Sequence, residues 1–357
     1  MPKWFKKLSI IALLSACTSA CHNRVGTWGD NPQDTDIVRF SSGLSIPVMS
    51  RVVAGNRFYY VRMRIGGGPE TNVILDTGSI GLRAIAAVVP HRDRDGKTNV
   101  YSFESGSELH GSVSNESVTV GQHQLGVIPI QVVDNLRCTV RVPNCPVARL
   151  DQSTPFAQGI DGRSNQEFGG ILGIRLFAHD RVIPNPLRAA GIKRWVVQLP
   201  RRDGELGTLT LDTSLAELNG FSRMTVDKNG SISACLDGDD TRETQCLPTV
   251  LDSGDPHVFV YLSDVGNHVL APGMAMKLVF TDTNNAAQKV MVKFTSAKNQ
   301  MKPSRDLPRY DPALVSFKQL KEPGRTPYIN SGYLPFISYV IYFDADERVI
   351  GLMARHS

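Results

Sequence analysis

Two short tripeptides of the same kind have the residue types and spacing to carry out chemistry. They are Asp76-Thr77-Gly78 and Asp252-Ser253-Gly254, which lie 176 residues apart. Each follows an apolar run, at residues 73–75 in the first half of the chain and 250–251 in the second. An aspartate on a sharp turn after a buried strand directs its carboxyl group into a cleft, and a glycine lets the turn fold back tightly. The pattern therefore predicts two carboxyl groups that meet in one cleft.

Two carboxyl groups held close together cannot both ionise readily, so they share one proton. The ionised member accepts a proton from a water molecule while the protonated member donates one to a peptide carbonyl. Water then adds to the amide without a covalent intermediate. We therefore interpret Asp76 and Asp252 as a candidate catalytic pair, in which the hydroxyl groups of Thr77 and Ser253 brace the partner loop.

Chance produces one such string far more easily than two. By composition, one apolar-apolar-Asp-Ser/Thr-Gly string is expected about once in tens of chains of this length, and a second one in the other half is rarer by roughly a further order of magnitude. A near match at residues 211–214 lacks the glycine, and we discard it. The alternative, two unrelated β-turns in loops, stays open at this point.

The size and composition of the chain are typical of a globular protein. Its 357 residues suffice for two domains of ordinary size, and 41% of them are hydrophobic and 20% charged. The net charge is +5, and the basic residues are scattered along the chain. This distribution does not favour a nucleic-acid surface. We expect a monomer that binds no nucleic acid.

The first 17 residues have the pattern of a lipoprotein signal peptide. Three lysines precede a short apolar run at residues 8–14, and the segment ends in Leu14-Ser15-Ala16-Cys17. The run is too short to span a bilayer as a permanent helix. The final tetrapeptide resembles a bacterial lipobox, in which the cysteine is lipidated and becomes the new N-terminus, so Cys17 is the predicted lipidation site. The alternatives are an ordinary secretory signal and lipidation at Cys21.

This signal predicts a location in the bacterial cell envelope. The lipid would anchor the chain in the membrane, and residues 18–44, which contain many small polar residues, would form a flexible tether. Thr18 follows the cysteine, and in similar lipoproteins a residue other than Asp at this position goes with the outer membrane. We expect the protein at the outer membrane, facing the periplasm or the exterior.

Four further cysteines favour two local disulfides. Cys138 and Cys145 are seven residues apart, and Cys235 and Cys246 are eleven residues apart. Local pairs are expected for bonds that staple loops in an oxidising compartment. Four cysteines allow three connectivities, so the local pairing is a preference.

Short apolar runs broken by turns predict an all-β chain. Few windows keep a helical period, and many short strands with Gly, Pro and Asn turns are typical of barrel-like domains. Short helices are expected near residues 186–190 and 312–320. A polar turn near residue 203 places the boundary between an N-terminal lobe, residues 45–205, and a C-terminal lobe, residues 206–357.

The chain resembles the pepsin-like (A1-type) aspartic proteases from about residue 57 to its end. Besides the two tripeptides, the resemblance is carried by residues 58–69, 103–111, 170–173, 205–212 and 332–352. It implies a bilobal fold, with two β-barrel-like lobes and a cleft between them. It also implies an aspartic endopeptidase that acts on a peptide or protein substrate without a cofactor. The string from Asp76 to Arg83 further resembles an uncharacterised group of bacterial lipoproteins.

The site residues that this resemblance implies are assigned by position. Asp76 and Asp252 would be the catalytic pair. The residues that would support them are Thr77, Gly78, Ser79, Ser253, Gly254 and Asp255. The residues that would form the flap over the substrate or contact the substrate are Tyr101, Phe103, Ser105, Gly106 and Arg83. The cleft would accept an extended peptide by strand-like pairing.

Asp255 is the main departure from the family pattern, which has a hydroxyl residue at this position. A third carboxylate near the pair would repel it and raise the pKa values of the group. His257 would offset that charge if it is protonated, and otherwise it points into solvent. In the same half, Asn330-Ser331-Gly332 replaces an apolar-apolar-Gly segment.

The flap departs from the pattern as well. Phe103 aligns with the family's flap tyrosine, and Tyr101 lies two positions earlier, so it takes that place only if the register slips. Arg83 replaces the tryptophan that would pair with that tyrosine. We expect Arg83 either to stack on Phe103 or to be solvated.

Two functions therefore stay open. The chain is either an aspartic endopeptidase or a non-catalytic pepsin-like lipoprotein that binds peptide or another envelope ligand in the same cleft. Other chemistry has little support, because the eight histidines show no His-Glu-x-x-His spacing and the cysteines show no Cys-x-x-Cys. We expect no metal and no other cofactor.

Overall fold

The computed structural model describes residues 37–53, 56–92, 96–149, 160, 168–177, 182–202, 204–238, 246–266, 270–297, 311–320 and 324–355. The predicted signal peptide, the lipidation site Cys17, its alternative Cys21 and residues 18–36 of the predicted tether lie outside these residues. Within them, no helix is long and apolar enough to cross a membrane.

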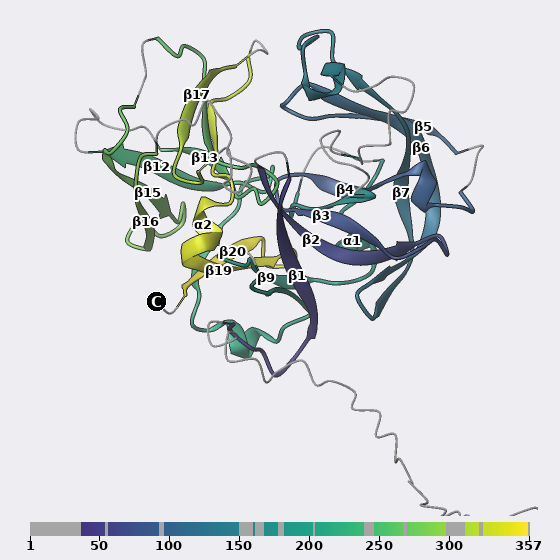
Figure 1. Ribbon diagram of the computed structural model, residues 1–357. Helices are drawn as coiled ribbons and strands as arrows, with labels where there is room; N and C mark the ends of the chain where they lie inside the picture. Colours follow the sequence, from purple (N-terminus) through teal and green to yellow (C-terminus); the bar gives the residue numbers. More distant parts are fainter. Residues whose placement is uncertain are drawn as a thin grey trace, which may run out of the picture.

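Strands make up most of the described chain, which confirms the all-β prediction (Figure 1). The helices of the described residues are α1 (Pro186–Ala189), α2 (Leu334–Ser338) and the 3-10 helices η1 (Ala86–Val88), η2 (Pro146–Arg149) and η3 (Leu215–Leu218). Helix α1 confirms one of the two expected helices. The other expectation is wrong: strand β17 (Val315–Gln319) forms there and pairs in parallel with β14 (Val258–Leu262). Pairing with a neighbouring strand outweighs local preference at this position.

One large sheet runs through most of the described chain and joins strands from both of its ends. In hydrogen-bonded order its strands are β11 (Ser222–Thr225), β20 (Val349–Ala354), β19 (Tyr339–Asp344), β9 (Arg194–Gln198), β10 (Gly207–Leu211), β1 (Leu44–Val53), β2 (Asn56–Ile65), β3 (Thr71–Asp76), β8 (Gly170–Ile174), β4 (Ile80–Ile85), β7 (His123–Cys138), β6 (Ser107–Val120) and β5 (Thr98–Ser102). The C-terminal strands therefore close against strands of the first half. The predicted boundary at residues 205/206 stays a prediction.

A second, smaller sheet belongs to the second half of the chain alone. In hydrogen-bonded order its strands are β16 (Lys289–Thr295), β15 (Ala275–Thr281), β12 (Ile232–Gly238), β13 (Leu247–Val250), β18 (Tyr328–Asn330), β14 and β17. In Figure 1 this sheet lies on the opposite side of the molecule from β4 to β7, and β9, β19 and β20 lie below the space between them.

The same three-strand arrangement occurs once in each sheet. Strand β3 leads through a short loop to β4, and β8 lies between them, parallel to β3 and antiparallel to β4. Strand β13 leads through a loop to β14, and β18 lies between them, again parallel to the first and antiparallel to the second. Each tripeptide of the sequence analysis lies in or next to the loop of one arrangement. The two loops are therefore held by equivalent strands.

Trp195 and Phe343 lie where the closing strands meet the first half of the chain. Phe343 of β19 is opposite Trp195 of β9, and the rings stack with centroids 5.9 Å apart. The exposed fractions of the two residues are 0% and 2%. Burial of two large aromatic side chains fixes this junction, because each removes a large apolar area from water.

Both predicted disulfides are present. Cys138 bonds to Cys145 at the end of β7, and Cys235 of β12 bonds to Cys246 next to β13. Each bond closes a short segment between neighbouring elements, as the local spacing predicted. A cross-link of this kind restricts the unfolded chain and so favours the folded state.

Truncating the buried ring of Phe343 tests how much the junction between the two ends of the chain contributes. We expect Phe343→Ala to lower the free energy of unfolding by about 3–5 kcal/mol, because it leaves a cavity in the core. Urea unfolding followed by circular dichroism measures this change. Val140→Ala, at a side chain that is 98% exposed, is the control and should stay within about 0.5 kcal/mol of the wild type. A loss below about 1 kcal/mol for Phe343→Ala would contradict a stabilising role for the packing of Phe343 against Trp195.

Candidate active site

The first carboxyl group, that of Asp76, ends β3 and is held by its own loop. The Gly78 amide donates to Asp76 Oδ1 over 2.8 Å, and the Ser79 amide donates to the same atom over 3.0 Å. The Ser79 hydroxyl donates to Asp76 Oδ2 over 2.6 Å. Asp76 is buried, with an exposed fraction of 7%. Three donors therefore fix the orientation of this carboxyl group.

The second carboxyl group, that of Asp252, follows β13 and is held by two donors. The Gly254 amide donates to Asp252 Oδ1 over 2.8 Å, which repeats the contact between Gly78 and Asp76. The side-chain amide of Asn330, at the end of β18, donates to Asp252 Oδ2 over 2.7 Å. Asn330 thus takes the place that Ser79 has beside the first carboxyl group.

Reciprocal hydrogen bonds join the two loops directly. The Thr77 amide donates to Ser253 Oγ over 3.0 Å, and the Ser253 amide donates to Thr77 Oγ1 over 2.9 Å. The Thr77 hydroxyl donates to the Leu251 carbonyl over 2.8 Å, and the Ser253 hydroxyl donates to the Leu75 carbonyl over 2.6 Å. Both hydroxyl residues are almost fully buried. Each loop therefore satisfies buried polar groups of the other.

Space, and not backbone conformation, explains the glycine of each tripeptide. Neither Gly78 nor Gly254 has a positive φ. A Cβ added at Gly78 would lie 2.1 Å from Cγ of Asp252, and one at Gly254 would lie 3.0 Å from Cγ of Asp76. Each glycine therefore packs against the carboxyl group of the other loop. This contact brings the two carboxyl groups together.

Asp252 lies among other carboxylates, which affects its protonation. Burial raises the pKa of Asp252 well above its ordinary value, and the charges of Asp255 and Asp76 raise it further. Hydrogen bonds from Asn330 and Gly254 act in the opposite direction. The Asn330 amide also donates to Asp255 Oδ2, so it bridges Asp252 and Asp255. Asp255 thus has the repulsive effect that the sequence predicted, and Asn330 moderates it.

His257 does not offset the charge of Asp255, and the two expectations for it are wrong. It is buried, with an exposed fraction of 3%, so it does not point into solvent. Its Nε2 lies 3.0 Å from Ser316 Oγ, and its ring packs on Phe259 with centroids 4.1 Å apart. Burial and the charge of Lys318 lower the pKa of His257 to about 4. The ring is therefore neutral above that pH.

Arg83 is buried, and its ring partner is Tyr101. The guanidinium Cζ lies 3.4 Å from the Tyr101 ring centroid, and the exposed fraction of Arg83 is 0%. Its Nη1 donates to the carbonyl groups of Ile80 and Gly81. The expectations of a solvated Arg83 and of one stacked on Phe103 are both wrong. Phe103 instead packs its ring edge against Tyr101, with centroids 5.0 Å apart.

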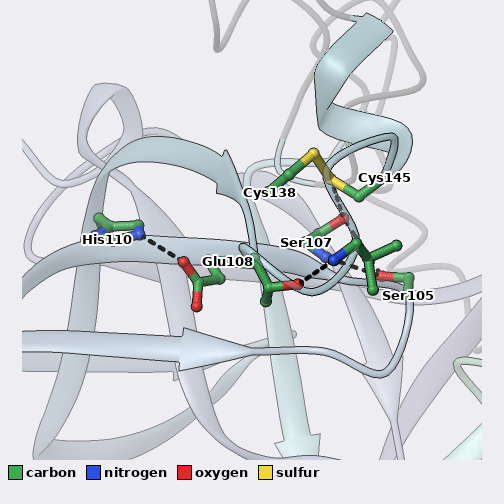
Figure 2. The surroundings of a disulfide bond; sticks show 8 residues. Ser105, Ser107, Glu108, His110, Cys138 and Cys145 are labelled. Atoms are coloured by element: carbon green, nitrogen blue, oxygen red, sulfur yellow. Dashed lines mark hydrogen bonds and ion pairs between the residues drawn. A yellow bond between two sulfur atoms is a disulfide. The ribbon is translucent and has the colours of Figure 1, made fainter. Parts of the chain in front are cut away.

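The β5–β6 hairpin, which contains the predicted flap, has a well-defined turn. The Phe103 amide donates to the Ser107 carbonyl, and the Gly106 amide donates to the Phe103 carbonyl, both over 2.9 Å. The Thr139 amide donates to the Gly106 carbonyl. Figure 2 shows the turn beside the Cys138–Cys145 disulfide, where the Ser107 hydroxyl lies 3.8 Å from Cys145 Sγ. The disulfide loop therefore supports the turn of the hairpin through the hydrogen bond from Thr139 to Gly106.

The hairpin also contacts the other side of the cleft. Glu104 at its tip forms an ion pair with Arg325, which precedes β18, over 2.5 Å. The Arg325 guanidinium lies over the Tyr328 ring, and Tyr328 stacks on Tyr261 with centroids 4.5 Å apart. This chain of contacts links the hairpin tip to the second sheet. The hairpin therefore forms a roof over the carboxyl pair.

The space enclosed by these elements is a cleft of about 1170 Å³. Residues that line it come from both loops, from the hairpin, from the disulfide loop and from the second sheet. Among them are Asp76, Gly78, Ser79, Tyr101, Phe103, Ser105, Gly106, Val140, Arg175, Asp252, Gly254, Asp255, Tyr261 and Asn330. Arg83 does not line this cleft, but it contacts Tyr101, which does.

Sequence reasoning missed three polar side chains of this site. Asn330 was noted only as a departure from a pattern, whereas Arg175 and Arg325 were not noted at all. Arg175 directly follows the apolar run of β8, and a charge at the end of a buried strand was the signal that could have found it. No comparable signal marks Arg325, because its partner Glu104 is distant in the sequence. Among the described residues, no group of three or more His, Cys, Asp or Glu side chains is placed to hold a metal ion.

Comparison with known proteins gives one family match. Residues 70–186 match a family described as a protein of unknown function, DUF3443. This segment contains the Asp76 loop, the hairpin and Arg175, whereas Asp252 and Asn330 lie outside it. No curated protein matches the chain.

The reciprocal hydrogen bonds between the loops predict energetic coupling. We expect Thr77→Val and Ser253→Ala each to lower the free energy of unfolding by about 1–3 kcal/mol, since each leaves a buried amide without its acceptor. The double variant should lose less than the sum, because either change already loosens the contact between the loops. Urea unfolding of the four proteins measures the difference.

Thr249→Val is the matched control, because the Thr249 hydroxyl is buried and donates to the Leu247 carbonyl of its own strand. Combined with Thr77→Val it should give additive losses. Additivity of Thr77→Val with Ser253→Ala would show that the loops do not depend on each other.

The raised pKa of Asp252 predicts that stability falls as the pH rises. Its pKa in the folded protein lies above its ordinary value, so the folded state binds a proton that the unfolded chain releases. The resulting stability is complete below the ordinary pKa of 3.8 and is lost as the pH rises through the folded value. Asp255→Asn removes a repelling charge, so we expect it to raise the midpoint of thermal unfolding at pH 7.5 by about 2–4 °C.

The gain should shrink at pH 3.5, where the raised pKa keeps Asp252 protonated in both proteins, so that it carries no charge for Asp255 to repel. Thermal unfolding across this pH range measures it. Asp264→Asn, at an exposed aspartate away from the cleft, is the control. An equal gain at both pH values would contradict electrostatic repulsion as the cause.

Proposed function

We propose that this chain is a pepsin-like aspartic endopeptidase of the bacterial envelope, with Asp76 and Asp252 as its catalytic pair. The single observation that carries the proposal is the contact between the two loops. Reciprocal hydrogen bonds between Thr77 and Ser253 hold the loops together, and each glycine packs on the opposite carboxyl group. Two unrelated β-turns would have no reason to form this contact.

The repeated strand arrangement supports a bilobal, pepsin-like architecture. Strands β3, β4 and β8 support one loop, and β13, β14 and β18 support the other with the same pairing directions. Each half of the chain thus contributes one carboxyl group from an equivalent place. The cleft lies between the supporting sheets, beneath the β5–β6 hairpin.

The proposed reaction is hydrolysis of a peptide bond by an activated water molecule. Burial and neighbouring charges raise the pKa of Asp252, so this residue is suited to donate a proton to the peptide carbonyl oxygen. Asp76, oriented by Ser79 and the two loop amides, accepts a proton from the water molecule that attacks the carbonyl carbon. The tetrahedral intermediate then collapses: the leaving nitrogen takes up the proton held by Asp76, the C–N bond breaks, and a hydroxyl group of the intermediate returns a proton to Asp252 as the carbonyl reforms. No covalent bond to the chain forms.

The substrate is proposed to be an extended peptide or an unfolded protein segment. The cleft is roofed by a hairpin whose strand β5 carries Tyr101 and whose tip reaches Arg325. An extended chain fits a narrow space of this kind by pairing with exposed backbone. The location in the envelope rests on the sequence pattern that ends at Cys17.

One observation favours the second candidate, a non-catalytic protein that binds peptide or another envelope ligand. Asp255 shares Asn330 with Asp252, and the charge of Asp255 raises the pKa of Asp252. If both members of the pair stay protonated at the working pH, the site has no base to activate water. Binding in the cleft would then persist without cleavage.

Cleavage of a peptide library between pH 3 and pH 8 tests the two candidates. We expect the wild type to cleave, and Asp76→Asn and Asp252→Asn each to lower the rate by about 10²–10⁴-fold, because each removes a proton-transfer group. Mass spectrometry of the products measures the rates. Asp212→Asn is the matched control, since Asp212 belongs to the near match that lacks a glycine and lies exposed on the surface.

The control should cleave like the wild type. Absence of cleavage at every pH, or equal cleavage by wild type and both active-site variants, would refute the protease. Peptide binding by a wild type that does not cleave would support the second candidate.

A further inference from the structure

Arg175 is held against the Asp76 loop by its backbone. It directly follows β8, and its amide donates to the Ser79 carbonyl over 2.9 Å. Its carbonyl accepts a hydrogen bond of 2.9 Å from the side chain of Asn185, which caps α1. Hydrogen bonds to both its backbone amide and its backbone carbonyl therefore fix the position of Arg175. The side chain begins directly beside the candidate catalytic pair.

The side chain of Arg175 reaches from the first half of the chain to the second. Nη1 lies 3.5 Å from the Gly78 carbonyl, and Nη2 donates to Ser231 Oγ over 3.2 Å. Ser231 directly precedes β12 of the smaller sheet. Gly78 is the residue whose Cα packs on the carboxyl group of Asp252. The guanidinium therefore lies next to the loop contact and lines the cleft.

The charged and titratable groups around this side chain come from several elements. The charges of Asp252, Asp227, Tyr101 and Tyr328 influence Arg175 electrostatically, and Tyr101, Asp252 and Tyr328 line the same cleft as Arg175. Burial lowers the pKa of Arg175, and the charge of Asp252 is the largest influence in the opposite direction. Arginine stays protonated in proteins even so. Coulomb attraction acts equally on both partners, so the guanidinium also stabilises the ionised form of Asp252.

Three other basic residues that line the cleft are less suited to this task. His257 is neutral above about pH 4. Arg325 forms an ion pair with Glu104 at the hairpin tip. Lys318 lies over the Phe259 ring, at 5.7 Å from its centroid. Asp76, Asp252 and Asp255 bring three carboxyl groups to one cleft, and the guanidinium of Arg175 contacts Gly78 in the loop that carries Asp76.

We propose that Arg175 is the counter-ion of this three-carboxylate site. Its guanidinium offsets the charge that Asp255 adds beside Asp252. The pair of Asp76 and Asp252 then holds one negative charge, with one carboxyl group ionised and the other protonated. Arg175 is a positioning residue, because it acts on Asp252 and does not itself exchange a proton. The inference rests on the proposed function in taking the pair as the working group, yet its main test needs no turnover.

Titration of the aspartate carboxyl carbons by ¹³C NMR tests the counter-ion directly. Asp252→Asn identifies the resonance, and the pair is read as two apparent pKa values. We expect Arg175→Gln to raise the upper value by about one pH unit, because it removes a positive charge from the cleft that the pair lines. Arg175→Lys keeps the charge and should stay near the wild-type value. Arg188→Gln, at an exposed arginine beside Phe177, is the control and should change nothing.

A second pair of variants covers the case in which Arg175→Gln does not fold. Asp255→Asn and Asp255→Asn/Arg175→Gln differ by the same charge in a less repulsive site, and the same rise of about one pH unit is expected between them. No rise in either comparison would refute the counter-ion. A change for Arg175→Lys as large as that for Arg175→Gln would also refute it, because the hydrogen bonds and not the charge would then be the cause.

The outcome separates this inference from the proposed function. A wild type that cleaves no peptide, but whose pair titrates higher in Arg175→Gln, supports the counter-ion and refutes the protease. A chain that cleaves peptide with the same pH profile with and without Arg175 supports the protease and refutes the counter-ion.

Discussion

Four hydrogen bonds between residues 75–77 and 251–253 are the interaction on which the rest of the site depends. The amides and hydroxyl groups involved are buried, so each loop alone would leave several polar groups without partners. The two halves of the chain must therefore meet at this place. Once they do, Gly78 and Gly254 pack on the opposite carboxyl groups. A side chain at Gly78 has no room, and one at Gly254 would be tightly crowded.

The loop contact places carboxyl groups close together, and their mutual repulsion must be reduced by neighbouring residues. It gathers Asp76, Asp252 and Asp255 in a buried space, where like charges interact strongly. Asn330 responds with an amide that donates to two of these groups. His257, two residues after Asp255, is neutral and packs beside Phe259. Asn330 and Asp255 are thus physically related, because the side-chain amide of Asn330 donates to the carboxylate of Asp255.

Patterns that depend on neighbouring residues predicted a large part of the structure. The alternation of apolar runs and turns predicted the strands, and short cysteine spacings predicted both disulfides. The segment at residues 312–320 shows the limit of such patterns. A helix was expected there, but strand β17 forms and pairs with β14. Arg83 shows it too. Its partner Tyr101 lies on a strand that reaches it only in the folded sheet, and no local pattern distinguishes Tyr101 from Phe103 as that partner.

The sequence by itself determined the strand-rich architecture, the disulfide pairs and the two tripeptides that merit attention as a site, because these depend on residue types and short spacings. Tertiary structure alone decided why each glycine is required, which ring covers Arg83, how His257 is packed, and that Asn330 and Arg175 belong to the site. These features arise from contacts between residues that are far apart in the chain. Burial and charge at such contacts depend on three-dimensional distances, which residue order does not contain.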